Sequence, residues 1–137
     1  MYIIGLLTEK AMGLLNGMTD AYEGERNSEG RAHGHGKKHW SNGKVYEGEF
    51  QNGKQHGQGT CVYAHWDKYE GEWFADKRHG FGEHTYANGD VYQGQWHEGK
   101  RHGRGKFSYA DGGTWEGNFE NGVACLELAS QPATRKS

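Results

Sequence analysis

The chain has few of the residues on which many small folds depend. Only 33% of its 137 residues are hydrophobic, and it has two cysteines, Cys61 and Cys125. Two cysteines without a secretion signal are expected to remain reduced thiols, which argues against a disulfide framework. The formal net charge of −2 gives no electrostatic reason to expect nucleic acid as a partner. Low hydrophobicity together with 24 glycines would by itself indicate disorder.

The chain does contain a repeat. Its units open on aromatic residues spaced 24, 23, 23 and 23 apart, which are Tyr22, Tyr46, Tyr69, Tyr92 and Trp115. A period of this size indicates a repeat architecture, in which one unit cannot bury its own apolar face. Stacked units make long, shallow surfaces, which suit macromolecules better than a small substrate.

Two motifs recur within the units, and we take them as the structural and partner-binding positions. An aromatic-x-Gly-x-aromatic stretch is formed by Tyr46, Gly48, Phe50, Tyr69, Gly71, Trp73, Tyr92, Gly94, Trp96, Trp115, Gly117 and Phe119. A His-Gly-x-Gly stretch is formed by His56, Gly57, Gly59, His79, Gly80, Gly82, His102, Gly103 and Gly105. Asn-Gly and Asp-Gly dipeptides near them accept the positive φ angles of tight hairpin turns. Each unit is therefore predicted to be two short strands and two turns.

Period-two alternation assigns side chains to the two faces of the predicted sheet. Tyr46, Gly48 and Phe50 point to one face, while Glu47 and Glu49 point to the other. A glycine within a strand leaves a hollow in which a neighbouring ring can lie. The predicted fold is all-β, a single-layer antiparallel meander of stacked hairpins over residues 22–122, with rings packed over glycines on its inner face.

The second strand of a unit is assigned in the same way. In the second unit, Gly57, Gly59 and Cys61 are expected to share a face with Tyr63. The aromatics at the same position in the other units are Trp40, Tyr86 and Tyr109. A valine at Gly80 is then expected to clash with a neighbouring ring such as Tyr69 or Trp73.

These motifs resemble the MORN family (membrane occupation and recognition nexus), whose signature is similar to Tyr-x-Gly-x-Trp-x-x-Gly-Lys-x-His-Gly-x-Gly. The resemblance covers residues 22–122. The first unit has Arg26 in place of an aromatic and one inserted residue within 27–30, and the last continues as Val-Ala-Cys-Leu over 123–126. The unusual first unit resembles the first repeat of radial spoke head MORN proteins of motile cilia. This resemblance implies a place in the axoneme of a cilium or flagellum.

The sequence offers no motif for catalysis or for a cofactor. Gly103-x-Gly105 lacks the third glycine and the helix of a dinucleotide site, and there is no Walker lysine. Glu47 and Glu49 recur along the array, which is typical of a solvated face rather than of acid–base chemistry. Cys61 is expected to be a small packed side chain. We therefore predict that the chain is not an enzyme and binds no cofactor.

Nine histidines raise the question of a metal site. His56, His79 and His102 occupy one repeat position, so successive copies should lie two strands apart, about 9.5 Å. A shared zinc needs ligand nitrogens about 2.0–2.1 Å from the ion. We therefore expect no metal and assign these side chains to the closing of hairpins beside the glycines.

Charged residues form two rows along the array. An acidic to neutral stripe on the outer face consists of Glu47, Glu49, Glu70, Glu72, Gln93, Gln95 and Glu116. A basic edge near the hairpin turns consists of Lys54, Lys77, Arg78, Lys100 and Arg101. The rows either only solubilise the protein or set the register of a docked partner.

The segments that flank the array carry weaker signals. Residues 1–21 include an apolar stretch that is interrupted by Glu9 and Lys10. The interruption disfavours a signal peptide, and the stretch is too short to span a bilayer. It is expected to be a short helix that caps the sheet or docks on a partner, or one that touches a membrane surface. Residues 123–137 are expected to hold a terminal strand and a disordered tail.

Three functions remain open from the sequence. The first is a scaffold in the cytoplasm or cytoskeleton that binds other proteins of a ciliary assembly such as the radial spoke head, with self-association through exposed strand edges. The second is a peripheral membrane module with weak contact to anionic lipid. The third is a regulatory domain detached from a larger enzyme, since MORN arrays also accompany lipid kinases and methyltransferases.

Overall fold

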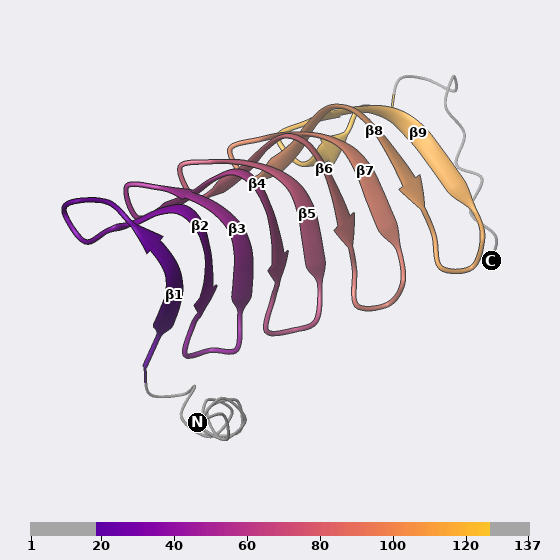
Figure 1. Ribbon diagram of the computed structural model, residues 1–137. Helices are drawn as coiled ribbons and strands as arrows, with labels where there is room; N and C mark the ends of the chain where they lie inside the picture. The colour runs from indigo at the N-terminus through magenta and orange to yellow at the C-terminus, as the bar shows by residue number, and fades with distance from the viewer. Residues whose placement is uncertain (1–18, 127–137) are drawn as a thin grey trace.

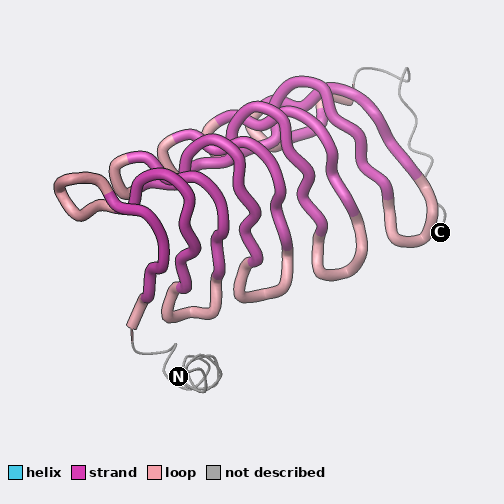
Figure 2. The backbone as a smooth tube through the Cα atoms, viewed as in Figure 1, coloured by secondary structure: helices cyan, strands magenta, loops and turns pink. Residues whose placement is uncertain are grey.

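The computed structural model describes residues 19–126, all of which lie in strands, turns and short connections. Ten strands form one antiparallel sheet in which the spatial order is the order along the chain. They are β1 (Ala21–Arg26), β2 (Ala32–His39), β3 (Val45–Gln51), β4 (Lys54–Val62), β5 (Lys68–Phe74), β6 (Lys77–Thr85), β7 (Val91–His97), β8 (Lys100–Ser108), β9 (Thr114–Glu120) and β10 (Val123–Ala124). The predicted all-β, single-layer antiparallel meander is confirmed, and no helix occurs in this part of the chain (Figure 2). The helix predicted near the N-terminus and most of the predicted tail lie outside the described residues.

The strands bend together, so that the sheet is an open arch (Figure 1). A row of glycines crosses the arch from strand to strand in register: Gly24, Gly36, Gly48, Gly59, Gly71, Gly82, Gly94, Gly105 and Gly117. A Cβ on Gly59 or on Gly82 would collide with the ring of the tyrosine that lies over it, Tyr46 or Tyr69. The row must therefore be free of side chains for the rings to lie on the backbone.

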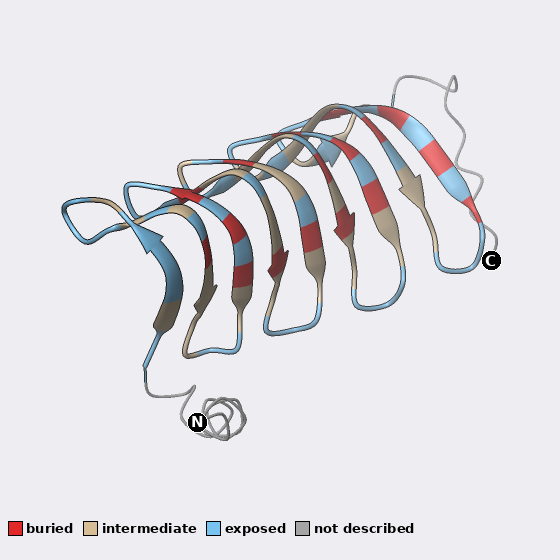
Figure 3. Ribbon diagram, in the orientation of Figure 1, coloured by how far each residue is buried: buried red, intermediate tan, exposed pale blue. Residues whose placement is uncertain are grey.

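The core is one layer of rings on the concave face. Tyr46, Tyr69 and Tyr92 are completely buried, and the buried positions recur along the strands in Figure 3. Edge-to-face contacts join the rings across the sheet, for example Tyr46 to Trp73 with centroids 5.3 Å apart and Tyr69 to Trp96 at the same separation. Such pairs add to the stabilisation from burial. The predicted inner face of rings over glycines is correct for these positions.

Hydrogen bonds hold the rings in place. The hydroxyl of Tyr46 donates to the carbonyl of Glu49 at 2.8 Å, and Nε1 of Trp73 donates to the carbonyl of Gly59 at 3.1 Å. Tyr69 and Tyr92 donate to the carbonyl three residues ahead in the same way. A buried ring with a polar atom therefore satisfies that atom on the backbone, which fixes its position as well as its burial.

The predicted face of the first glycine in His-Gly-x-Gly was wrong. The register between β3 and β4 is interrupted beyond Gly48, so that Gly59 pairs with Gly48 but Phe50 pairs with Gln55. Gly57 lies within this bulge at φ 68°, and a Cβ on it would collide with the carboxylate of Glu49 on the convex face. Simple alternation fails because a bulge changes which face the following residues meet.

The corresponding expectation for Gly80 changes as well. Gly80 has φ 65°, and its Cβ would meet the side chain of Glu72 rather than a ring. The glycine beneath the ring of Tyr69 is Gly82. A valine at Gly80 should still destabilise the fold, because a β-branched residue is strained at positive φ.

Candidate docking site on the concave face

A hollow of about 390 Å³, the central hollow, opens on the concave face above the core rings. Its lining includes the rings of Tyr63, Tyr86 and Trp96 and the cations of Arg78, Lys100 and Arg101. Tyr63 and Tyr86 were predicted to lie within the strands. They instead stand one residue beyond β4 and β6, where each begins a turn. They still pack against the core.

Two arginines turn into this hollow instead of joining the predicted basic edge. The guanidinium of Arg78 lies 4.4 Å from the centroid of Trp96, and that of Arg101 lies 5.1 Å from the centroid of Phe107. Nη2 of Arg78 donates to the carbonyl of Gly99 at 2.7 Å, and Nη2 of Arg101 donates to the carbonyl of Gly122 at 2.9 Å. Each arginine is therefore held by the turn of the following unit, a partner that the sequence of its own unit does not reveal.

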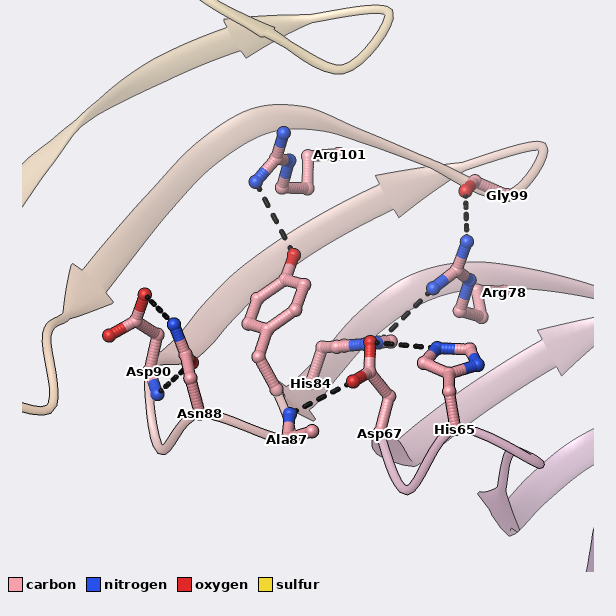
Figure 4. A network of polar contacts seen from close by, with 10 residues as sticks. His65, Asp67, Arg78, His84, Ala87, Asn88, Asp90, Gly99 and Arg101 are labelled. Carbon is pink, nitrogen blue, oxygen red and sulfur yellow. Dashed lines mark hydrogen bonds and ion pairs between the residues drawn. The ribbon is translucent and has the colours of Figure 1, made fainter.

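A buried polar network lies at one side of the hollow (Figure 4). Nε2 of His84 lies 3.0 Å from Oδ2 of Asp67, and Nδ1 of His84 lies 3.1 Å from Nη1 of Arg78. Because an arginine N–H can only donate, Nδ1 must accept, and the ring proton of His84 sits on Nε2, where it donates to Asp67. The network therefore selects one neutral tautomer.

The pKa shifts agree with this assignment. Burial lowers the pKa of His84, the hydrogen bond with Asp67 opposes the shift, and the charge of Arg78 adds to it. For Asp67, burial opposes ionisation, but hydrogen bonds from His84, the Ala87 amide and His65 outweigh it, so that the pKa of the carboxyl lies below its ordinary value. At neutral pH the network thus joins a carboxylate, a neutral imidazole and a guanidinium.

The sequence motifs did not single out this network, although one signal was present. His84 stands at the repeat position that is Cys61 in the unit before it and Phe107 in the unit after it. Trp66 occupies the position that is glycine in the other turns between repeats, Gly43, Gly89 and Gly112. Departures from a repeat at aligned positions therefore mark the residues that the shared motif cannot explain.

A second, smaller hollow lies toward the N-terminus on the same face. This N-terminal hollow has a volume of about 300 Å³, and its lining includes Lys38, Trp40, Lys44 and Gln55. The ammonium groups of Lys38 and Lys44 lie 4.9 and 4.1 Å from the centroid of Trp40. Both hollows therefore combine cations with aromatic rings, as in cation–π pairs.

The histidines of the His-Gly-x-Gly motifs do not line the central hollow but lie beside the turns within the repeats. His56 and His79 flank Phe74, with ring centroids 5.1 and 5.7 Å from it, and His97 lies between His79 and His102 at 5.3 and 5.6 Å. Across residues 19–126, no group of three or more histidine, cysteine or acidic residues is arranged to hold a metal ion. Instead, Nδ1 of His102 accepts a hydrogen bond from the amide of Asn121 in the next turn at 3.4 Å.

The remaining predicted residues have structural positions. The rings and the second glycine of each motif form the concave core, whereas Gly57, Gly80 and Gly103 sit in the bulges. Cys61 is fully buried, and burial raises the pKa of its thiol, which disfavours the thiolate that a nucleophile needs. The residues of the acidic stripe alternate with the buried rings along β3, β5, β7 and β9, which places them on the convex face, and all but the half-buried Glu72 are exposed.

Comparison with known families supports the resemblance in the sequence. The family model described as MORN repeat matches residues 28–45, 46–68, 69–91 and 92–114, together more than half of the chain. Comparison with curated proteins finds no matching relative. The described residues contain no helix with the length and apolar character needed to cross a membrane.

Proposed function

Because the chain belongs to the MORN repeat family, we propose that it is a non-catalytic scaffold that binds a partner protein on its concave face within a larger assembly. The distribution of charge is the observation that carries this proposal. Lys38, Lys44, Arg78 and Arg101 face the two hollows, and in the described part of the chain none of them forms an ion pair with a carboxylate. Each hollow also has one aspartate in its lining, Asp67 or Asp76, but the cations outnumber it. Cations that lie among rings and form no ion pair suit an incoming acidic group.

The shape of the surface favours a protein segment over a membrane. The hollows lie on the concave face. A bilayer surface is flat and would meet the rims or the convex face of the arch in Figure 1 first. A chain segment can enter the arch and place side chains in both hollows. This is how a concave repeat surface usually serves recognition.

The histidine network argues for binding rather than catalysis. An aspartate–histidine pair can activate a nucleophile only when the second ring nitrogen is free to take a proton. In His84 that nitrogen already accepts a hydrogen bond from Arg78, and the residue is only 4% exposed. The pair therefore positions Arg78 in the wall of the hollow.

The assembly that we propose is a ciliary or flagellar axoneme, with the radial spoke head as the specific location. What supports this proposal is the resemblance of the first unit, with Arg26 in place of the second aromatic and one inserted residue, to the first repeat of radial spoke head MORN proteins. Self-association is a related proposal. Within residues 19–126, β1 and β10 are the outermost strands of the sheet, and such edges are where another strand can add.

Expression of the tagged full chain in ciliated cells tests this function. The protein should remain with axonemes after detergent extraction and should be released by salt if charges guide docking. Arg101→Glu on the concave side of β8 should reduce retention, whereas Arg104→Glu, an exposed arginine on the convex side of the same strand, should not. Complete recovery in the detergent-soluble fraction would reject the axonemal proposal.

A weak lipid contact is the second candidate, and one observation favours it. Lys54, Lys77 and Lys100 are exposed at the edge that carries the turns within the repeats. Each could contribute about 1 kcal/mol near an anionic surface, and the acidic convex face opposes this attraction. Binding of the purified chain to phosphatidylserine vesicles that is lost in a triple lysine-to-glutamine variant would support this candidate. A regulatory array that serves a catalytic domain elsewhere would show the same concave docking but no axonemal retention.

A further inference from the structure

One repeat position supplies a polar side chain to the concave face at regular intervals. Gln55, Arg78 and Arg101 are spaced 23 residues apart and pair across their hairpins with Phe50, Trp73 and Trp96. Since each unit adds two strands, neighbouring members of this row are separated by about 9.5 Å along the sheet. The row therefore repeats with a fixed spacing inside the arch.

The N-terminal member of the row has an unused hydrogen-bond donor. Gln55 is 3% exposed, and among the described residues its side-chain nitrogen has no hydrogen-bond partner. Asp76 shares the lining, and its Oδ1 accepts the backbone N–H of Gln55 at 2.9 Å, but neither of its oxygens bonds to the side-chain nitrogen. Because a buried donor without an acceptor is costly, turning this side chain toward the hollow becomes favourable when a bound molecule supplies an oxygen.

The arginines of the row also have donors to spare. Each guanidinium has five N–H groups. Those of Arg78 reach His84 and Gly99, and those of Arg101 reach Tyr86 and Gly122. The remaining N–H groups can donate to a carboxylate that enters the central hollow.

Building on the proposed function, we infer that the partner segment is extended, runs across the strands inside the arch, and carries an acidic side chain at every third residue. In the extended polyproline II conformation a chain advances about 3.1 Å per residue with three residues per turn, so every third side chain lies on the same face, about 9.3 Å from the one before, which matches the spacing of the row. A helix advances about 1.5 Å per residue and would need its acidic residues six or seven positions apart. The row thus sets both the charge and the spacing of the ligand.

Two synthetic peptides of equal composition test this inference on the full chain. The first is Glu-Pro-Thr repeated four times, which holds an extended conformation with a glutamate at every third position. The second contains the same twelve residues with its glutamates at positions 1, 3, 5 and 7. Binding measured by fluorescence anisotropy should be about tenfold tighter for the first, since correct spacing adds at least one charge-assisted hydrogen bond.

Matched variants assign the effect to the row. Arg78→Gln and Arg101→Gln should each weaken the first peptide about tenfold, and Arg101→Lys should weaken it less, because charge remains while the fork is lost. Arg104→Gln on the convex side should leave affinity unchanged. Circular dichroism and thermal melting of each variant separate loss of binding from loss of fold.

Several outcomes would overturn the inference. These are equal affinity for the two peptides, no measurable affinity for either, an unchanged affinity of Arg101→Gln, or tighter binding of a helical peptide with glutamates seven apart. Phosphatidylserine vesicles that bind with the same arginine dependence while the peptides fail would assign the row to lipid. If the inference fails but a partner from axonemes cross-links to the concave face, the proposed function stands with a ligand of different chemistry.

Discussion

Two junctions between neighbouring repeats are built on the same backbone with different chemistry. At the Trp66 junction, Asp67 in the turn between β4 and β5 accepts the amide of Ala87 at 2.9 Å. At the Gly89 junction, Asp90 in the turn between β6 and β7 accepts the amide of Ala110 at 2.8 Å. Each aspartate thus ties its turn to the turn one repeat later, so that both junctions share a hydrogen bond that sets the stacking of repeats.

The turns themselves differ. Gly89 has φ 100°, and Oδ1 of Asn88 accepts the amide of Asp90 at 2.9 Å, which is the local chemistry that such a turn favours. Trp66 has φ 77° and is 78% exposed, a costly conformation for a bulky residue in an unfavourable environment for its ring. Both turns have the same backbone hydrogen bonds, and the Trp66 turn adds the network of Asp67, His84 and Arg78. The comparison teaches that a tertiary network can substitute for glycine in a repeat turn.

Replacing the glycine beneath a core ring should have the largest effect and should not distinguish the junctions. Gly82→Val and Gly105→Val each drive a side chain into a tyrosine ring, Tyr69 or Tyr92. We expect each to lower the free energy of unfolding by about 3 kcal/mol or more in urea titrations. A difference above about 1 kcal/mol between the two variants would contradict the view that the glycine row beneath the rings is equivalent at both junctions.

Removing the aspartate should separate the junctions. Asp67→Ala leaves the Nε2–H of buried His84 without an acceptor, so we expect a loss of about 2–3 kcal/mol. Asp90→Ala removes an exposed hydrogen bond to the amide of Ala110 and has no buried histidine as a partner, so about 1 kcal/mol is expected. Equal losses in urea titration would mean that the network contributes nothing beyond the shared hydrogen bond.

Acid should weaken the Trp66 junction selectively. Because the pKa of His84 is lowered in the folded protein, the unfolded chain binds a proton near pH 6.5 that the native state resists. This contribution to stability is present above that pH and declines as the pH falls below it. Thermal melting at pH 7.5 and 5.5 should show a larger drop for the native chain than for His84→Phe, which copies Phe107 of the Gly89 junction. An identical drop in the two proteins would assign the acid sensitivity to other histidines.

Restoring glycine at the strained turn should have the smallest effect and the opposite sign. Trp66→Gly removes the cost of positive φ and should raise the free energy of unfolding by about 1 kcal/mol. Trp66→Ala removes the exposed ring but keeps a Cβ, so it serves as the control and should gain less. Destabilisation by Trp66→Gly would show that the indole stabilises the fold through contacts of its own.

The sequence was sufficient to predict the meander and its ring core, because Asn-Gly turns and period-two alternation are local signals. It was insufficient for Gly57 and Gly80, since a bulge interrupts the alternation and is set by pairing with the preceding strand. It also misplaced Arg78 and Arg101, whose acceptors are carbonyls of the next turn, 21 residues ahead. The pairing of Asp67 with His84 crosses a repeat boundary and follows from no single motif.

The strand order has a consequence for how the protein loses structure. Among the described residues each strand pairs only with its neighbours along the chain, and the further hydrogen bonds between turns reach only to the next repeat, so the ends can open while the middle stays paired. Unfolding should therefore be graded rather than all-or-none, with amide hydrogen exchange fastest at β1 and β10 and slowest at β5 and β6. Such a sheet can release its terminal strands to a neighbour while β5 and β6 stay paired. Loss of the last turn would take away Gly122, the acceptor of Arg101, and with it part of the wall of the central hollow.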